Sequence, residues 1–358
     1  MQRSVFVHLS ENCAEQISFC KNPSFPALLV GNCLEDGAKE SAMKTKKISV
    51  VPYHADWPKV FEKEALKIQE ALGADCIAIH HIGSTSVPGL SAKPIIDILG
   101  VVKDPQQAIQ CIESLGFKYK GEYNIPMRFY FTRSGEVEIN LHVYEEDHPE
   151  IELNLLFRDY LRGHPEARDE YALLKEDLLK KKASHEKNNS PFTGYNLGKD
   201  AFIRKILKAV QYDRIRMMKC THYAEWDFAK KIRQKYFFDG LSMMDPYTWT
   251  FNHQDHAHLV LYKGVELVGY GHIQFWVEGR AALRIFVIEE EHRGGGLGSQ
   301  LLHLCEKWLQ RQGVRSLHTE ARLDVVKFYA RNGYSEMPFN DPSGELSSVH
   351  DLAMGKVL

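Results

Sequence analysis

Apolar positions acquire a regular spacing from about Ile48 and keep it to about Val210. A first group recurs every three to four residues, which places it on one helix face, and ends at Gly73. Strands, a helix, a hairpin that turns at 133–136 and charged amphipathic helices follow in that order, and this order predicts a mixed sheet with helices packed on it. The predicted ranges are strands at 76–82, 94–102, 127–132 and 137–144, and helices at 105–115 and within 151–210.

The pattern restarts after a linker predicted at 211–216, and a second domain is expected over 217–358. Residues 1–47 show neither helical nor strand periodicity and are predicted to be a disordered tail, with Met43 directly before the first patterned segment. The second domain is predicted to contain helices at 224–236, 299–312 and 324–332 and strands at 258–262, 265–276, 282–288 and 316–321.

Charge and composition narrow the class of protein. Lys and Arg number 45 against 47 Asp and Glu, so no positive excess predicts binding to nucleic-acid backbones. The seven cysteines include no Cys-x-x-Cys pair, which is typical of reduced thiols, and no apolar run is long enough to span a bilayer. We therefore expect a cytoplasmic protein with neither a nucleic acid nor a membrane as its partner.

A glycine-rich loop, Arg293–Gly298, lies between an apolar strand and a helix whose buried side carries Leu301 and Cys305. Backbone N–H groups that no side chain shields, at a helix N-terminus, form a site for a pyrophosphate, and the helix dipole adds attraction. The spacing Arg-x-x-Gly-x-Gly differs from the dinucleotide-binding spacing Gly-x-Gly-x-x-Gly. The loop is therefore predicted to hold a phosphorylated cofactor.

From about Met217 to the C-terminus, this part of the chain resembles the GNAT superfamily of acyl-CoA N-acyltransferases. The resemblance rests on the loop, on the strand Ala281–Ile288 before it, and on Val325–Tyr334, which is similar to the family's Phe-Tyr-x-x-x-Gly-Phe helix end. It implies a twisted mixed sheet that splays open to admit acetyl-CoA. The cofactor-binding residues that it implies are Val287, Ile288, Arg293, Gly294, Gly295, Gly296, Leu297, Gly298 and Ser299.

Three residues are candidates for catalysis within that resemblance. Tyr329 occupies the position of the family's general acid, which protonates the departing CoA thiolate, and a tyrosine pKa of ~10 suits a thiol leaving group. The strand position at which some relatives carry a catalytic Glu is Ala282 here. Glu320 and His272, on strands expected to be neighbours, are candidates to relay a proton through water or are ordinary strand residues.

A histidine cluster, His253, His256 and His258, lies at the start of one predicted strand. It lacks a further ligand pattern such as His-Glu-x-x-His, so a zinc site is not predicted. Aromatic residues, among them Trp249 and Phe251, are close in sequence. This stretch is expected either to line the acceptor-substrate side of the sheet or to pack there.

The first domain carries the run His80–Asp97, in which a Gly83-Ser84 turn follows one strand and Asp97 lies in the next. A backbone N–H and a hydroxyl at that turn can hold a nucleotide phosphate while Asp97 holds a divalent cation against it. The run resembles the GrpB family, whose fold is nucleotidyltransferase-like, and the resemblance covers about Ile48 to Val210. The nucleotide-binding residues that it implies are Gly83, Ser84, Lys93, Asp97 and Lys199.

Metal chemistry in this domain depends on how many carboxylates meet. Two-metal nucleotidyl transfer requires several, and the partner position of Asp97 on its own strand is Leu99. Glu138, which shares a predicted strand face with Asn140, is the expected second ligand of Mg²⁺ beside Asp97. Four basic residues either meet a triphosphate or are solvated helix charges, namely Arg158, Arg162, Lys175 and Lys199.

These patterns predict an α/β protein in which a GrpB-like nucleotide-binding domain over 48–210 is fused to a GNAT N-acetyltransferase domain. The second domain is expected to transfer an acetyl group from acetyl-CoA to an amine on a small molecule or protein. Two alternatives stay open. The GNAT fold binds acetyl-CoA as a sensor or scaffold without transferring, or the first domain is a nucleotidyltransferase with an accessory acetyltransferase domain.

Overall fold

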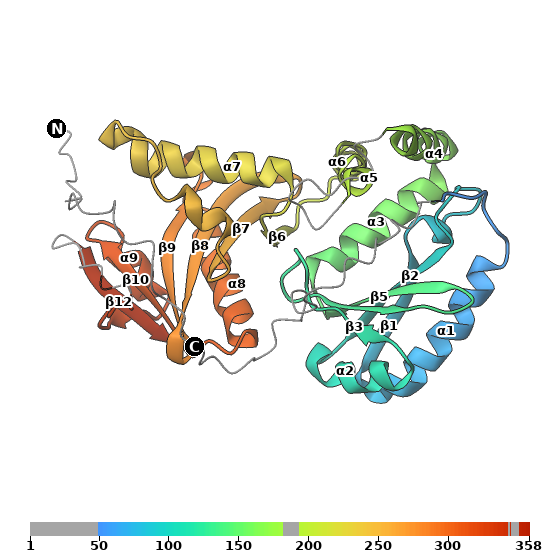
Figure 1. The fold of residues 1–358 in the computed structure, drawn as a ribbon, viewed down its shortest axis with the longest axis horizontal. Coiled ribbons are helices and arrows are strands. Elements are labelled where there is room, and N and C mark those ends of the chain that lie inside the picture. Colours follow the sequence, from blue (N-terminus) through green and yellow to red (C-terminus); the bar gives the residue numbers. More distant parts are fainter. Residues whose placement is uncertain (1–48, 182–192, 343, 345–350) are drawn as a thin grey trace, which may run out of the picture.

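The computed structural model describes residues 49–181, 193–342, 344 and 351–358, which form two α/β lobes (Figure 1). Each lobe is built on one mixed sheet, so the fold class predicted from the sequence is confirmed. The predicted tail, residues 1–47, lies outside the described residues. Among the residues that the structure describes, no helix combines the length and the apolar character needed to cross a membrane.

The first sheet has the strand order β1-β2-β5-β4-β3, with β2 and β5 parallel and the other pairs antiparallel. Helices α1 and α2 cover one face through apolar residues such as Ile68 and Ile112, which are fully buried. Helix α3 contributes Ile151 and Leu155 to a cluster on the other face. The bounds are α1 Trp57–Leu72, β1 Cys76–Ile82, β2 Ile95–Val102, α2 Pro105–Ser114, β3 Lys118–Tyr119, β4 Phe129–Arg133, β5 Glu138–Glu145, α3 Pro149–Gly163, α4 Pro165–Lys180, α5 Gly194–Leu197 and α6 Asp200–Ala209.

The second sheet has the order β11-β12-β10-β9-β8-β7-β6, in which only β9 and β10 are parallel. Helix α7 lies along one face, and α8 and α9 pack against the other. The bounds are β6 Ile215–Lys219, α7 Tyr223–Arg233, β7 His256–Lys263, β8 Glu266–Trp276, β9 Arg280–Ile288, α8 Leu297–Arg311, β10 Ser316–Arg322, α9 Val326–Arg331, β11 Ser335–Glu336 and β12 Asp351–Val357.

The linker predicted at 211–216 is shorter in the structure, because Ile215 and Arg216 already belong to β6. Strand β6 was missed because its apolar positions are interrupted by Arg216, whose guanidinium is neutralised by Glu150 of the other lobe at 2.8 Å. Strand β12 was missed as well, although it pairs with all seven residues of β10. Both strands lie towards the margins of the sheet, where alternation of apolar residues is weakest.

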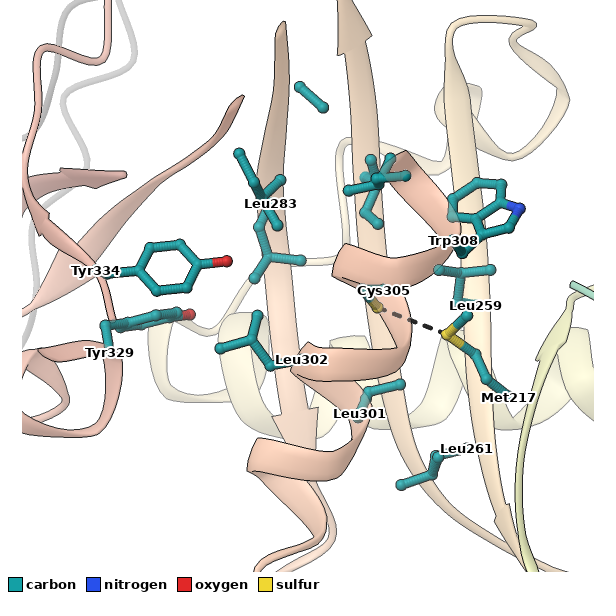
Figure 2. Close-up of a cluster of buried hydrophobic side chains, with 14 of the residues drawn as sticks. Met217, Leu259, Leu261, Leu283, Leu301, Leu302, Cys305, Trp308, Tyr329 and Tyr334 are labelled. Atoms are coloured by element: carbon teal, nitrogen blue, oxygen red, sulfur yellow. Dashed lines mark hydrogen bonds between the residues drawn. The ribbon is translucent and has the colours of Figure 1, made fainter. Parts of the chain in front are cut away.

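The core beneath α8 joins the sheet to both helices on that face (Figure 2). Leu301, Leu302 and Cys305 of α8 are fully buried against β8 and β9, as the spacing of these residues predicts. Tyr329 of α9 and Tyr334, which follows it, point from the side towards Leu302 (Figure 2). The helix that begins at the glycine loop is therefore fixed by packing along its whole buried face.

The interface between the lobes combines a shared apolar cluster, which includes Tyr144 and Met218, with ion pairs of one polarity. The first lobe supplies the carboxylates and the second supplies the cations, and these groups meet at 2.6 to 3.1 Å. Backbone contact adds to it, because the Lys219 amide of β6 donates to the Asn124 carbonyl at 2.9 Å. The pairs are Glu122–Lys219, Glu145–Lys307, Glu145–Arg311, Glu150–Arg216 and Glu152–Arg214.

Glu122 has three donors at the interface, since it accepts from the Met127 amide at 2.8 Å, the Trp308 indole at 3.0 Å and Lys219 at 3.1 Å. Replacing it with alanine leaves these donors unpaired at a site that is only 12% exposed. We expect Glu122→Ala to lower the free energy of unfolding by about 2 kcal/mol in urea titration. Glu136→Ala, at an exposed hairpin position, is the control, and an equal effect of both changes would contradict this account of the interface.

Candidate functional site

The parallel pairing of β9 and β10 stops soon after it begins. Ser316, Leu317 and His318 pair with β9 residues 280–282, and the two strands then continue without pairing to Arg322 and Ile288. Beyond this point the Thr319 hydroxyl donates to the Leu283 carbonyl at 3.1 Å, in place of a backbone pair. The sheet is therefore open along the second half of β9, where an extended ligand can bond to backbone groups.

The glycine loop lies at the open end of β9. Gly294 and Gly296 have φ of 82° and 81°, in the left-handed region that favours glycine, and α8 begins directly after Gly296. Residues 293–296 are exposed. The Arg293 guanidinium turns back to donate to the Ile288 carbonyl at 2.9 Å and lies 4.8 Å from the centre of the Tyr236 ring.

The space around the loop fits a phosphorylated ligand. A Cβ built on Gly294, Gly295 or Gly296 would meet no atom within 4 Å, so the loop has open space beside its backbone. Gly298 differs, because a Cβ there would lie 3.2 Å from the Phe328 ring, so this glycine allows α8 and α9 to pack closely. The first amides of a 15-residue helix and its dipole then attract an anion at the loop.

The other predicted cofactor residues lie around the same opening. Val287 and Ile288 are buried at the end of β9, Leu297 is buried at the start of α8, and Ser299 is half-buried in its first turn. The structure thus brings the whole predicted cofactor set together at one end of β9. Because an alternation of apolar residues followed by glycines is visible in the sequence, this grouping could be predicted before the structure.

Tyr329 lies in α9, on the α8 side of the opening, and is 6% exposed. Burial raises the pKa of Tyr329 to about 12, with a hydrogen bond to Thr319 acting in the opposite direction. The hydroxyl therefore stays protonated at neutral pH. Thr319 is the first residue of β10 beyond the paired segment, so Tyr329 is held beside the opening.

Glu320 and His272 were expected on neighbouring strands, and this expectation is wrong because β9 separates β10 from β8. Both side chains nevertheless lie on the α7 face. Leu317 and Ala321 pack in the core beneath α8, so Glu320 points to the opposite face. His272 shares that face with Tyr270, which packs in the cluster beside α7.

His272 belongs to a buried polar network that the sequence did not reveal. Arg233 is fully buried and forms a bidentate ion pair with Asp245 at 2.6 and 3.0 Å. It also contacts the Tyr270 hydroxyl at 3.2 Å and His272 Nδ1 at 3.3 Å. The only signal in the sequence is that Arg233 follows Ala229 by four residues and so continues the apolar face of α7.

The network fixes the protonation of its histidines. A guanidinium only donates, so His272 Nδ1 accepts and its Nε2 carries the proton that is donated to His256 Nδ1 at 2.8 Å. His258 Nε2 must donate to the Thr250 carbonyl at 3.1 Å, and its Nδ1 then accepts from Tyr270 at 2.5 Å. Both nitrogens of His272 and of His258 are therefore occupied by hydrogen bonds within the network.

The Gly83 turn and Asp97 meet in the first lobe as predicted. Gly83 has φ of 69°, and a Cβ there would overlap Asp97 Oδ2. Asp97 Oδ1 accepts from Asn140 Nδ2 at 2.9 Å, and Asn140 in turn accepts from the Tyr130 hydroxyl at 2.8 Å. Burial raises the pKa of Asp97 to about 6, against the hydrogen bond from Asn140 and the charges of Lys199 and Lys93.

Glu138 was expected beside Asp97, but the register of β2 and β5 places Asn140 there and Glu138 opposite Ile95. Sequence could place Glu138 and Asn140 on one face but could not fix the register that decides between them. Within residues 49–181 and the other described segments, no group of three His, Cys, Asp or Glu side chains could hold a metal ion. The histidines 253, 256 and 258 likewise form no such group.

Three lysines from separate elements converge on the same turn. Lys93 and Lys199 place their ammonium groups 4.3 and 4.9 Å from the centre of the Tyr195 ring, and Lys175 donates to Ser84 Oγ at 3.2 Å and to the Ser91 carbonyl. Burial lowers the pKa of Lys175 to about 7 and that of Lys199 to about 8, with repulsion between lysines contributing to both.

The arginines predicted as phosphate contacts instead bind the protein. Arg158 donates to the His81 carbonyl at 3.0 Å and pairs with Asp159. Arg162 donates twice to the Ser86 carbonyl, at 2.8 and 3.0 Å. Both therefore fix the strand and turn that carry Gly83 and Ser84.

Comparison with known proteins agrees with this geometry. The model of the GrpB protein family matches residues 47–209. The chain is 36% identical over 164 residues to the UPF0157 protein BH1888 of Halalkalibacterium halodurans, a match that covers 45% of this chain and 81% of that protein. The chain belongs to the GrpB family. Its C-terminal part matches the model of the acetyltransferase (GNAT) family over residues 224–334, so a GNAT domain follows the GrpB domain.

Other relatives cover the GrpB domain or the GNAT domain separately. The UPF0157 protein YqkA of Bacillus subtilis (strain 168) is 40% identical over 163 residues, which cover 44% of this chain and 46%, or about half, of that protein. The crystal structure of GrpB from Enterococcus faecalis is 35% identical, with a TM-score of 0.40, over 45% of this chain and 96% of that chain. The PaiA N-acetyltransferase of Thermoplasma acidophilum, in complex with coenzyme A, is 20% identical, with a TM-score of 0.27, over 38% of this chain and 80% of that chain.

A charged substitution in the glycine loop tests whether the loop binds the cofactor. Gly295 has an ordinary φ and open surroundings, so Gly295→Glu adds a negative charge and bulk without backbone strain. We expect coenzyme A binding, measured by titration calorimetry, to fall at least about 100-fold, because charge repulsion and bulk replace an anion site. Gly135→Glu, in the hairpin of the GrpB domain, is the matched control. Normal coenzyme A binding by the Gly295→Glu chain would contradict the assignment of the loop.

The buried histidines predict a loss of stability in acid. Burial lowers the pKa of His258 to about 4, below its value of ~6.5 in an unfolded chain. The folded state then binds fewer protons, so the contribution of His258 is complete above pH ~6.5 and is lost as the pH falls towards 4, at up to about 1.4 kcal/mol per pH unit. In urea titrations across this range, the free energy of unfolding should depend less steeply on pH in His258→Asn, by the equivalent of about one proton taken up on unfolding. The exposed His54→Asn should not, and equal slopes in all three chains would be inconsistent with a neutral buried His258.

Proposed function

We propose that the GNAT domain transfers an acetyl group from acetyl-CoA to a primary amine on a small molecule or a protein. The observation that carries this proposal is the opening between β9 and β10, which ends at the glycine loop. The loop supplies backbone donors for a pyrophosphate, and the unpaired half of β9 supplies backbone groups for an extended arm. Acetyl-CoA, when bound there, contributes an acetyl thioester.

Tyr329 is assigned the role of general acid. Its hydroxyl, buried beside Thr319 on the α8 side of the opening, donates a proton to the departing thiolate. A pKa raised by burial keeps this proton in place until the thiolate forms. The tyrosine thus favours transfer over the alternative in which the domain only senses acetyl-CoA.

Glu320 is assigned the role of general base. It accepts, through a water molecule, the proton that leaves the amine. It lies two residues beyond the last β9–β10 pair and faces the α7 side. His272 is assigned a different role, because Arg233 and His256 occupy both of its nitrogens. With Arg233 and Asp245, it holds the wall against which the acceptor binds.

The GrpB domain is proposed to bind a nucleotide at Gly83, Ser84, Lys93, Asp97 and Lys199. The convergence of three lysines on the Gly83 turn supports binding. The pairing of Asp97 with Asn140, in place of a second carboxylate, argues against nucleotidyl transfer in this domain. The acetyltransferase is therefore the proposed enzyme of the chain.

Replacing Tyr329 with phenylalanine tests the acid directly. We expect Tyr329→Phe to lower kcat of amine-dependent thiol release from acetyl-CoA by about 100-fold with little change in KM for acetyl-CoA, since only the proton donor is lost. Tyr334→Phe removes a neighbouring buried hydroxyl of the same cluster and should leave kcat within about twofold. Equal activity of the Tyr329→Phe and Tyr334→Phe chains would assign Tyr329 to packing alone.

A further inference from the structure

We propose that the GrpB domain binds a polyphosphate group through Lys93, Lys175, Lys199 and Ser84 without a divalent metal ion. The inference deepens the nucleotide-binding part of the proposed function, on which it rests. It replaces the magnesium expected from the sequence by three ammonium groups. The ligand is any compound with a linear di- or triphosphate, such as a nucleoside triphosphate.

The three lysines come from separate parts of the first lobe. Lys93 follows the turn, Lys175 lies in α4 and Lys199 precedes α6, and Lys199 interacts electrostatically with both of the other lysines. Lys93 and Lys199 share the Tyr195 ring at 4.3 and 4.9 Å. Among the residues described in the structure, none of the three lies within 4.0 Å of a carboxylate oxygen.

Basic groups outnumber acidic groups around Asp97. Three lysines stand against one carboxylate, Asp97, and an anion bound beside amines held out of water stabilises their charged form. Lys175 is only 2% exposed, whereas Lys93, Lys199 and Ser84 are half-buried, so the cluster is fixed at its base and reachable at its rim. A phosphate with several negative oxygens is the complementary ligand.

The surroundings of the two Asp97 carboxylate oxygens do not favour a metal ion. One oxygen accepts from Asn140 at 2.9 Å, and the other packs against Gly83 so closely that no side chain fits there. One oxygen is therefore hydrogen-bonded within the protein, and the other lies directly against the backbone of the turn. Magnesium also depends on carboxylates or phosphates for its ligands, and Asn140 offers Asp97 a donor where a metal site needs a second acceptor.

Titration calorimetry of the full chain with ATP and with inorganic tripolyphosphate tests the proposal, in EDTA and in excess magnesium. We expect binding in EDTA that magnesium does not strengthen. Lys199→Met should weaken it about tenfold or more, because a charge-assisted contact is lost. Lys103→Met, at an exposed position after β2, is the control and should bind as the unchanged chain does.

Asp97→Asn separates the metal-free site from a metal site. The asparagine keeps an oxygen for Asn140 and removes a negative charge next to the ligand, so we expect phosphate binding at least as tight as before. Loss of binding on Asp97→Asn in a chain with an unchanged melting temperature, or a strict need for magnesium, would overturn the proposal. So would a failure of both ligands to bind.

The glycine loop of the GNAT domain is a second anion site, so each titration is repeated in the Gly295→Glu chain. Phosphate binding that persists there and is lost on Lys199→Met belongs to the GrpB domain and supports the proposal. Binding that disappears with Gly295→Glu belongs to the GNAT domain and contradicts it. Coenzyme A titrations on the Lys199→Met chain report separately on the acetyltransferase, so failure of one proposal is distinguished from failure of the other.

Discussion

The early end of the β9–β10 pairing is the constraint on which the second domain depends. A parallel pair inside a sheet normally bonds along its whole length, and here it bonds over three residues of each strand. Buried Tyr329 lies next to Thr319, the first residue of β10 beyond the paired segment. Unpaired backbone is costly in a protein interior, so an opening of this kind is consistent with a ligand that completes the bonding.

Ion pairs help to join the two domains. Five carboxylate–cation pairs run in one direction across the interface, and Glu122 adds the indole of Trp308 from α8. Helix α8 is also the helix that begins at the glycine loop. The GrpB domain therefore contacts the element whose N-terminus forms the proposed cofactor site.

Sequence alone could predict those features that local pattern determines. The glycine loop, the strand before it and Tyr329 occupy adjacent segments, so their grouping followed from order along the chain. Features set by register or by distant contacts could not be predicted. Whether Glu138 or Asn140 meets Asp97 depends on a pairing between strands, and Arg233 is neutralised by Asp245 from a loop of irregular structure. Strand β6 was missed because Arg216 pairs across the domain interface.

Hydrogen–deuterium exchange of the full chain, with and without acetyl-CoA, tests the central claim most directly. If the open half of β9 and the glycine loop bind the cofactor, peptides covering residues 283–299 should exchange slowly with acetyl-CoA and rapidly without it. Peptides covering β1 and β2 should not change. Calorimetric binding of acetyl-CoA that leaves exchange in residues 283–299 unchanged would contradict the account.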